Sequence, residues 1–505
     1  MRFNFLASKK QQTTNHEEAL AWKMGPAAEL YAVVVTASLS DTFYEGADKR
    51  LERIRTLIAL NEPLFVAKLA VYARTQMHLR SIPLVLVVEL AKLHRGDSLV
   101  SRTVAAVVQR ADEITELLAY YQLSNGRSGT KKLNRLSKQL QKGLAMAFAK
   151  FDEYQFAKYN RDGAVKLRDA LFLVHPASTS ESQQALWDKI AANALATPYT
   201  WETELSALGQ QSYASAEAKA AAFRAKWEEL IDSGKLGYMA LLRNLRNILE
   251  TEVSGTHVQK VCAYLANERA VANSKQLPFR FLAAYREILQ LQSGFTSQVL
   301  TALEDAVQLS SRNLQGFGDE TKVVVACDVS GSMQQPISKK SKVLYYDIGL
   351  MLGMLLQNRC SNIVTGMFGD TWKVINLPRR SVLSNVQEFY RREGEVGYST
   401  NGFLVIRDLL NRRVKADKVM LFTDCQLWNS TGMVGHIAEE WKAYKRIAPG
   451  ARLYLFDLAG HGQAPIDLKN GDVFLIAGWS DKVFAVLEAI EAGGSALAAI
   501  EAVAL

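Results

Sequence analysis

The residues with the clearest chemical pattern are Asp328, Ser330 and Ser332, in the sequence Asp-Val-Ser-Gly-Ser directly after a predicted strand. Two hydroxyls two residues apart can face one point, Gly331 lets the backbone turn tightly, and Asp328 supplies negative charge. Hard oxygen ligands in near-octahedral geometry suit Mg²⁺, or Mn²⁺ as a substitute, rather than zinc. We therefore predict that this loop binds one divalent cation.

Two later segments are expected to complete the site. Thr400 precedes a predicted helix, and Asp424 follows the apolar run Val419–Phe422. This spacing resembles the metal-ion-dependent adhesion site of von Willebrand factor A domains. In that family DxSxS, a Thr and an Asp from three loops hold the ion, and one coordination position stays open for an acidic group of a partner. The alternative is that Asp/Ser-rich turns follow strands by chance, and Ser399 lies beside Thr400 as a competing hydroxyl.

The elements that would position these residues alternate between strand and helix after Asp319. This alternation predicts a Rossmann-like, mostly parallel sheet with helices on both faces, and ligands bind such sheets at the carboxyl ends of the strands. Apolar runs rich in Val, Ile, Leu and Phe predict buried strands. They are Val323–Cys327, Asn362–Phe368, Lys418–Phe422, Arg452–Phe456 and Val473–Ile476.

The chain from Glu17 to about Leu314 has apolar residues at three- and four-residue spacing, which predicts helices almost throughout. Proline and glycine cut the region into short helices, as in an α-solenoid of antiparallel helix pairs of the HEAT type. No clean sequence repeat supports this. The predicted fold class is thus α followed by α/β, with an all-α domain in residues 1–319 and the α/β domain in residues 320–505.

The composition sets wider limits. A chain of 505 residues with 49% hydrophobic residues should form at least two domains. The sequence contains no signal-peptide pattern and no apolar run of membrane-span length, so we expect a protein without membrane segments. Four scattered cysteines indicate neither zinc nor disulfides and favour a reducing, cytoplasmic compartment. They are Cys262, Cys327, Cys360 and Cys425.

A net charge of +9, mostly in residues 1–319, is compatible with nucleic acid but does not require it. Lys131, Arg135, Lys138 and Lys142 form one cationic stripe on a predicted helix, thickened by Lys132. Such a stripe favours contact with phosphates. The alternative is an ordinary solvated helix face.

Further along, Lys158, Tyr159 and Arg161 precede His175. Cationic and aromatic side chains together could contact phosphate and stack on unpaired bases. Taken by itself, a histidine such as His175 is more often a core or capping residue.

At this point the sequence resembles the TROVE module and, over nearly its full length, the Ro autoantigen family with its bacterial relatives. These proteins join a TROVE module to a C-terminal von Willebrand factor A domain. The resemblance rests on four segments in order: Arg80-Ser81-Ile82-Pro83, Lys158-Tyr159 followed by Leu167–His175-Pro176, Met239–Leu245, and Leu277–Arg280.

The resemblance implies a ring of HEAT-like repeats with a positively charged hole. It also implies that small noncoding Y RNAs bind the outer surface and that single-stranded ends of misfolded RNAs bind in the hole. Lys158, Arg161 and His175 match the family's Lys, Arg and His that contact Y RNA, although the spacing from Lys158-Tyr159 to Arg161 is one residue shorter here. The resemblance also implies a role in RNA quality control and stress survival. It further implies an exoribonuclease as a partner, tethered through the RNA.

The leading functional hypothesis is therefore a non-enzymatic RNA-binding scaffold. The alternative is a metal-dependent protein-recognition scaffold, in which the A domain holds an acidic group of a partner protein without specific RNA binding. A metal-dependent hydrolase is disfavoured, because the sequence has no Walker loop, no HExxH motif and no second carboxylate cluster.

Overall fold

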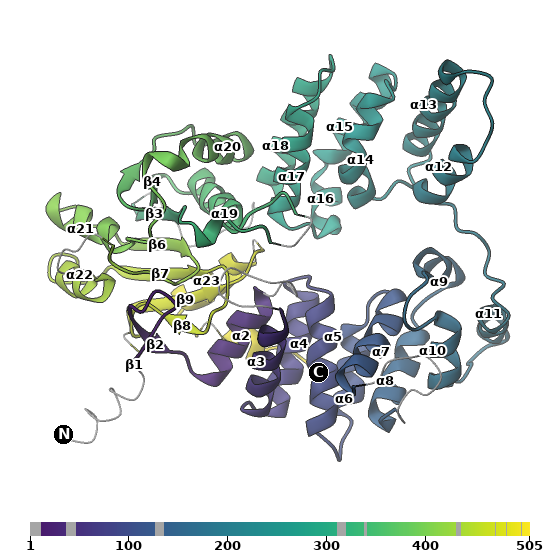
Figure 1. The fold of residues 1–505 in the computed structure, drawn as a ribbon, viewed down its shortest axis with the longest axis horizontal. Helices are drawn as coiled ribbons and strands as arrows, with labels where there is room; N and C mark the ends of the chain where they lie inside the picture. The colour runs from purple at the N-terminus through teal and green to yellow at the C-terminus, as the bar shows by residue number, and fades with distance from the viewer. Residues whose placement is uncertain are drawn as a thin grey trace. The chain divides into compact units, whose positions relative to one another are not determined.

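The computed structural model describes residues 12–36, 47–126, 136–310, 320–337, 341–430, 436–469, 471–480, 482–495 and 497–505. Helices dominate as far as α18 (Thr296–Leu309), and strands alternate with helices from β3 (Lys322–Asp328) onward (Figure 1). The predicted fold class is thereby confirmed. The chain forms two compact units, one of Met1–Glu52 with Ala220–Ala496 and one of Arg53–Lys219 with Leu497–Leu505. Domains at residues 1–319 and 320–505 stay a prediction.

In the unit that contains residues 53–219, most helices contact the next helix or the next but one, as in a solenoid of helix pairs. Most of the buried side chains are aliphatic, but Phe148, Phe156 and Trp187 of α8, α9 and α11 pack together as an aromatic cluster. None of the described helices in the chain is both long and apolar enough to cross a membrane. The helices are α4 (Pro63–Thr75), α5 (Ser81–Leu93), α6 (Leu99–Val107), α7 (Asp112–Ser124), α8 (Lys138–Phe148), α9 (Glu153–Tyr159), α10 (Leu167–Val174), α11 (Glu181–Ala191) and α12 (Trp201–Gly209), and α3 (Ala47–Ala59) and α24 (Ala498–Glu501) lie at its ends.

The helices of the other unit also pack against their neighbours along the chain. Arg286 on the helix before α18 forms two hydrogen bonds of 2.6 and 2.8 Å to the fully buried Asp347, which lies in the α/β part. Glu304 of α18 accepts the backbone N–H group of Ser384 at the start of a helix in the α/β part. These contacts explain why helices and sheet share one unit. The helices are α13 (Ala216–Asp232), α14 (Tyr238–Glu250), α15 (Gly255–Leu265), α16 (Glu268–Ser274) and α17 (Pro278–Leu289).

The six-stranded sheet has the order β5-β4-β3-β6-β7-β9, and all neighbours are parallel except β5 with β4. All five predicted strands coincide with observed ones, because their apolar runs are buried on both faces. The short edge strand β5 was not predicted. The strands other than β3 are β4 (Asn362–Phe368), β5 (Trp372–Val374), β6 (Lys418–Thr423), β7 (Arg452–Asp457) and β9 (Val473–Ala477).

Helix α19 (Tyr345–Arg359) packs closely against β3 and β6 at two glycines. A Cβ atom at Gly353 would lie 3.1 Å from Cys327 Sγ, and one at Gly349 would lie 3.2 Å from Phe422 Cβ. This close approach fixes the height of the helix over the strands that carry the candidate metal site. The remaining helices of the sheet domain are α20 (Leu383–Arg392), α21 (Phe403–Asn411), α22 (Ile437–Tyr444) and α23 (Val483–Glu491).

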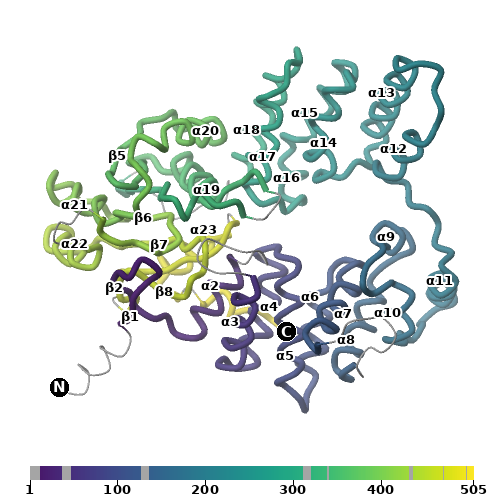
Figure 2. The backbone as a smooth tube through the Cα atoms, viewed as in Figure 1, coloured from purple at the N-terminus to yellow at the C-terminus, as the bar shows by residue number. Residues whose placement is uncertain are grey.

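The N-terminal part contains a hairpin of β1 (Gln12–Thr14) and β2 (Leu20–Lys23), which pairs with β8 (Gln463–Ala464) and is followed by α2 (Pro26–Val35). Figure 2 shows the purple hairpin beside this strand of the C-terminal part. The prediction of helix from Glu17 onward was wrong for β2. Its four residues are too few for a periodic signal, and β8, one of its two partner strands, lies more than four hundred residues away along the chain.

Candidate functional site

The predicted metal residues lie where β3 and β6 end side by side. Because both strands run in the same direction, Asp328 at the end of β3 lies close to Thr423 at the end of β6. The Thr423 hydroxyl donates a hydrogen bond of 2.6 Å to Asp328 Oδ2, and the backbone N–H of Ser330 donates one of 2.9 Å to Asp328 Oδ1. Both carboxylate oxygens of Asp328 are therefore held in place.

The three predicted hydroxyl ligands adjoin the two carboxylates. Ser330 Oγ and Ser332 Oγ are 3.3 Å apart, and the Ser332 hydroxyl forms a hydrogen bond with Asp424. The Thr400 hydroxyl donates a 3.0 Å hydrogen bond to the carbonyl of Gln426, two residues after Asp424. All five predicted residues are buried, so the structure brings the three loops together at the carboxyl edge of the sheet.

The electrostatics of this edge fit a cation. Burial, and then the charge of Asp424, raise the pKa of Asp328, and burial also raises the pKa of Asp424. A divalent cation would offset the repulsion between these carboxylates, and their oxygens and the three hydroxyls are the hard ligands that Mg²⁺ prefers. The described residues contain no group of three or more His, Cys, Asp and Glu side chains of metal-ligating geometry. Cation binding therefore depends on the mixed donor set and stays a prediction.

The N-terminal hairpin also contacts this edge, which the sequence did not indicate. The Asn15 amide donates to the Leu427 carbonyl at 2.9 Å, and the His16 backbone N–H donates to Gln426 Oε1 at 2.9 Å. The negative charge of Glu17 contributes to the raised pKa of Asp424. A pocket of about 330 Å³ lies beside these residues, and its lining includes Glu17, Phe403, Leu427 and Trp428.

The predicted RNA-contacting residues are only partly described. Lys131, Lys132 and Arg135 lie outside the described residues. The other five are all exposed to solvent, on α8, on α9 and in the loops after α9 and α10. They are Lys138, Lys142, Lys158, Arg161 and His175.

Helix α8 presents its two lysines because its opposite face is packed tightly on α6. A Cβ atom at Gly143 would lie 2.5 Å from Val104 Cβ, so only glycine permits this crossing. Ser137 caps the start of α8 by accepting the backbone N–H of Leu140 at 3.2 Å. The lysines at 138 and 142 are one turn apart on the free face.

The end of α10 lies beside α8. Gln141, next to Lys142, donates to the carbonyl of Val174 at 3.2 Å, and His175 follows directly as the C-cap of α10. His175 has a left-handed backbone with φ 50° and ψ 57°, and its side chain is exposed. The interpretation of His175 as a core histidine is therefore wrong, whereas the capping position is confirmed.

Aromatic rings accompany the cations on this surface. The Lys158 ammonium lies 5.5 Å from the centroid of the Tyr154 ring, and Arg168 lies 5.7 Å from that of Phe172. Tyr154 is 45% exposed and Phe172 is 50% exposed, so both rings could stack on bases. Neither ring was predicted from the sequence to contact RNA. The spacing of Arg168, Phe172 and His175, four and then three residues, was the available signal.

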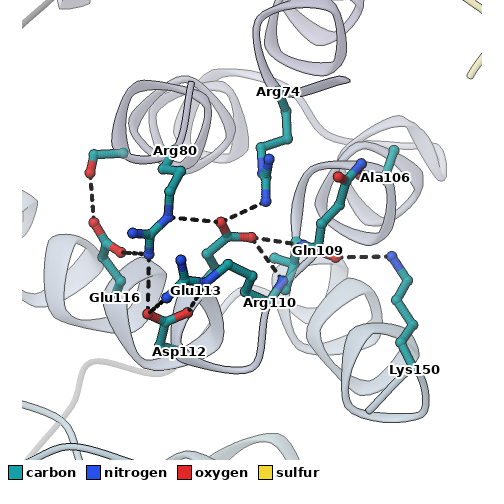
Figure 3. Close-up of polar contacts among 11 residues, drawn as sticks. Arg74, Arg80, Ala106, Gln109, Arg110, Asp112, Glu113, Glu116 and Lys150 are labelled. Carbon is teal, nitrogen blue, oxygen red and sulfur yellow. Dashed lines mark hydrogen bonds and ion pairs between the residues drawn. The ribbon is translucent and has the colours of Figure 1, made fainter. Parts of the chain in front are cut away.

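A buried ion-pair network supports the same region (Figure 3). Glu113 of α7 is fully buried and accepts hydrogen bonds from Arg74 at 2.8 Å and from the backbone N–H group of Gln109 at 2.8 Å. Arg80, in a segment that carries the resemblance, lies 3.5 Å from Glu113 and 3.1 Å from Asp112. Both oxygens of the buried carboxylate are thus satisfied, as such a charge requires.

Arg110 connects this network to the exposed surface. It donates to both oxygens of Asp112, at 3.0 and 2.7 Å, and its guanidinium lies 4.1 Å from the centroid of the Tyr159 ring. Tyr159 ends α9 directly after Lys158. Arg161, two residues further on, is 4.0 Å from Glu202, and both side chains are largely exposed. An ion pair that is this long and exposed contributes little to stability, so Arg161 remains able to bind an anion.

Comparison with known proteins gives matches over most of the chain. The sequence profile described as TROVE domain matches residues 7–226 and 193–325. Telomerase protein component 1 of Rattus norvegicus is 29% identical over 326 residues, which are 49% of this chain and 12% of that protein. The Mus musculus protein of the same name is 28% identical over 319 residues, 48% of this chain and 12% of its own length. The chain thus spans about 12% of the length of these curated relatives.

A solved structure is similar in fold. The crystal structure of the Deinococcus radiodurans RO (RSR) protein has a TM-score of 0.57 and 17% sequence identity to this chain. The similarity covers 91% of this chain and 99% of that one, so it includes both the helices and the sheet.

Proposed function

This chain belongs to the family of TROVE-domain proteins, and from this premise we propose that it is an RNA-binding protein of the Ro type. The observation that carries the proposal is the surface formed by α8, α9 and α10. It presents five exposed cationic or titratable side chains and two exposed rings, and of the carboxylates near them Asp162 lies 3.7 Å from Lys166 and Glu202 lies 4.0 Å from Arg161. The cationic side chains attract phosphates, and unpaired bases stack on the exposed rings.

The proposed chemistry is binding and not turnover. Lysines at 138, 142 and 158 would contact the backbone phosphates, while the rings of Tyr154 and Phe172 would stack on bases of a loop or a single-stranded end. We propose small structured RNAs of the Y type, and misfolded RNAs with single-stranded ends, as the ligands. A role as a cytoplasmic scaffold in RNA quality control and stress response, with an exoribonuclease recruited through the RNA, rests on the family resemblance.

Direct binding tests this proposal. Fluorescence anisotropy of a labelled hairpin RNA with a single-stranded tail should give an affinity that falls with rising salt, because binding releases counterions. A variant with Lys158, Arg161 and His175 replaced by Ala should lose most of this affinity. Absence of binding at low salt, or equal binding by the variant, would refute the proposal. The same RNA, incubated with protein and Mg²⁺ and run on a denaturing gel, should stay intact.

A second candidate function has its own observation. The two buried carboxylates and three hydroxyls at the end of β3 and β6 lie beside the pocket at Trp428, which would admit a side chain of a partner protein. In this proposal Asp328, Ser330, Ser332, Thr400 and Asp424 hold one Mg²⁺, or Mn²⁺. When bound, the ion would supply an open coordination position for an acidic group of the partner.

Partner capture distinguishes the two functions. Asp328→Asn should abolish Mg²⁺-dependent capture of an acidic partner protein while RNA affinity stays within twofold of the wild-type value. Loss of both activities together with a lower thermal midpoint would instead mean that the variant is misfolded.

A further inference from the structure

A second cationic site lies on helices far along the chain from α8–α10. Helices α14 and α17 pack side by side in the same direction. Near their starts the Tyr238 and Phe281 rings are 6.3 Å apart, and further along Arg246 of α14 lies 3.5 Å from Glu287 of α17. Two contacts in the same order on both helices fix the register between them.

This register places two more arginines beside each other. Arg243 is one turn before Arg246 on α14, and Arg280 is two turns before Glu287 on α17, so all four share the seam between the helices. At the far end of the seam the charges are balanced, because Arg246 also binds Glu250 at 2.8 Å. At the near end they are not balanced. Within the described part of the chain neither Arg243 nor Arg280 has an ion-pair partner.

The surroundings of Arg280 make the uncompensated charge more unfavourable. Arg280 lies in the first turn of α17, which contains no acidic residue, and Leu277 at the N-cap provides no side-chain cap. A cation at a helix N-terminus opposes the helix dipole. Burial of the guanidinium, and then the charge of Arg243, lower the pKa of Arg280, although the side chain as a whole remains exposed to solvent.

Like charges brought together from two helices are costly unless an anion joins them. We propose that Arg243, Arg280 and the N-terminal turn of α17 form a binding site for a phosphodiester group of single-stranded RNA. The two guanidinium groups donate to the phosphate oxygens, and the helix N-terminus adds its partial positive charge. The chain then contacts RNA through two separate helical groups. This inference rests on the proposed RNA-binding function.

The test uses the full chain and a 5′-labelled single-stranded oligouridylate, with anisotropy measured from low to high salt. The double variant Arg243→Gln/Arg280→Gln should bind about tenfold more weakly. The slope of log affinity against log salt should fall in magnitude by about 0.7, which corresponds to one lost phosphate contact. The control is Arg246→Gln, which removes one positive charge from the balanced end of α14, as each of the single variants Arg243→Gln and Arg280→Gln does at the near end, and it should leave affinity and slope unchanged.

Several outcomes would overturn the site. One is a double variant with the wild-type affinity and slope, and another is an Arg246→Gln variant that is equally impaired. A third is displacement of the oligouridylate by millimolar inorganic phosphate, but not by sulfate at the same ionic strength, which would mean a site for free phosphate. If the double variant has a lowered thermal midpoint, the single variants replace it, and each should bind the oligouridylate more weakly than the wild type does.

Failure of this site is distinguishable from failure of the proposed function. If the wild-type chain binds no RNA at all, the RNA-binding function itself fails. If the wild-type chain binds RNA and only variants at Lys158, Arg161 and His175 lose affinity, the function stands and the site at Arg243 and Arg280 is refuted.

Discussion

The Arg110 guanidinium lies 4.1 Å from the centroid of the Tyr159 ring while it holds both carboxylate oxygens of Asp112. A single side chain thus connects the buried network at the start of α7 with the residue that follows Lys158. Arg110 does not need to touch RNA to affect binding. Its contact holds the Tyr159 ring in place, and with it the end of α9 that carries Lys158.

Arg110→Ala should therefore weaken RNA binding by about two- to fivefold, which corresponds to the roughly 0.5–1 kcal/mol of a partly exposed cation–π contact. Anisotropy with the tailed hairpin RNA measures this change. The control Arg392→Ala removes an arginine from an exposed pair with Glu395 in the sheet domain and should bind as the wild type does. An Arg110→Ala variant with undiminished affinity would show that Tyr159 is not positioned in this way.

Glu113→Ala should lower the free energy of unfolding by about 3–5 kcal/mol, because it leaves the buried Arg74 without its counter-charge. Urea unfolding followed by circular dichroism measures the loss, within the transition that reports the helical unit. Glu395→Ala, an exposed carboxylate paired with Arg392 and Lys373, should change little. Equal effects of the two substitutions would contradict a structural role for the network in Figure 3.

His175 allows stability and binding to be separated. Its left-handed backbone disfavours any residue with a Cβ atom, so His175→Gly should stabilise the fold by about 1 kcal/mol. The same change removes the imidazole and should weaken RNA binding by about fivefold or more. His175→Ala should lose as much affinity without the gain in stability. Thermal unfolding and anisotropy on the same samples measure both effects, and wild-type affinity of either variant would exclude His175 from the RNA contact.

The metal prediction has a readout that needs no partner. Mg²⁺ at about 100 times its dissociation constant should stabilise the chain by roughly 2.7 kcal/mol, seen as a higher thermal midpoint that EDTA reverses. Asp328→Asn should abolish this shift. Glu439→Gln removes an exposed carboxylate from α22, away from the five proposed ligands, and should retain the shift. A shift that persists without Asp328 would place the cation elsewhere.

The sequence predicted best what depends on local pattern. Apolar runs identified β3 and β6, and their parallel pairing is sufficient to place Asp328 near Asp424. It could not predict contacts that depend on how distant segments fold together. Asn15 reaches Leu427 over a separation of 412 residues, and Arg110 meets Tyr159 only after α7 and α9 have packed. His175 was identified by motif, but its exposure depends on the position of α10 beside α8.

The central claim is that the surface of α8, α9 and α10 binds RNA phosphates, and the salt dependence of binding tests it most directly. Replacing Lys138, Lys142 and Lys158 by Gln should reduce the magnitude of the slope of log affinity against log salt by about 2, at about 0.7 per lost phosphate contact. Replacing Lys415, Lys442 and Lys469, three exposed lysines of the sheet domain, changes the net charge equally and should leave the slope unchanged. If both triple variants reduce the slope by the same amount, binding follows net charge alone, and the proposed surface is wrong.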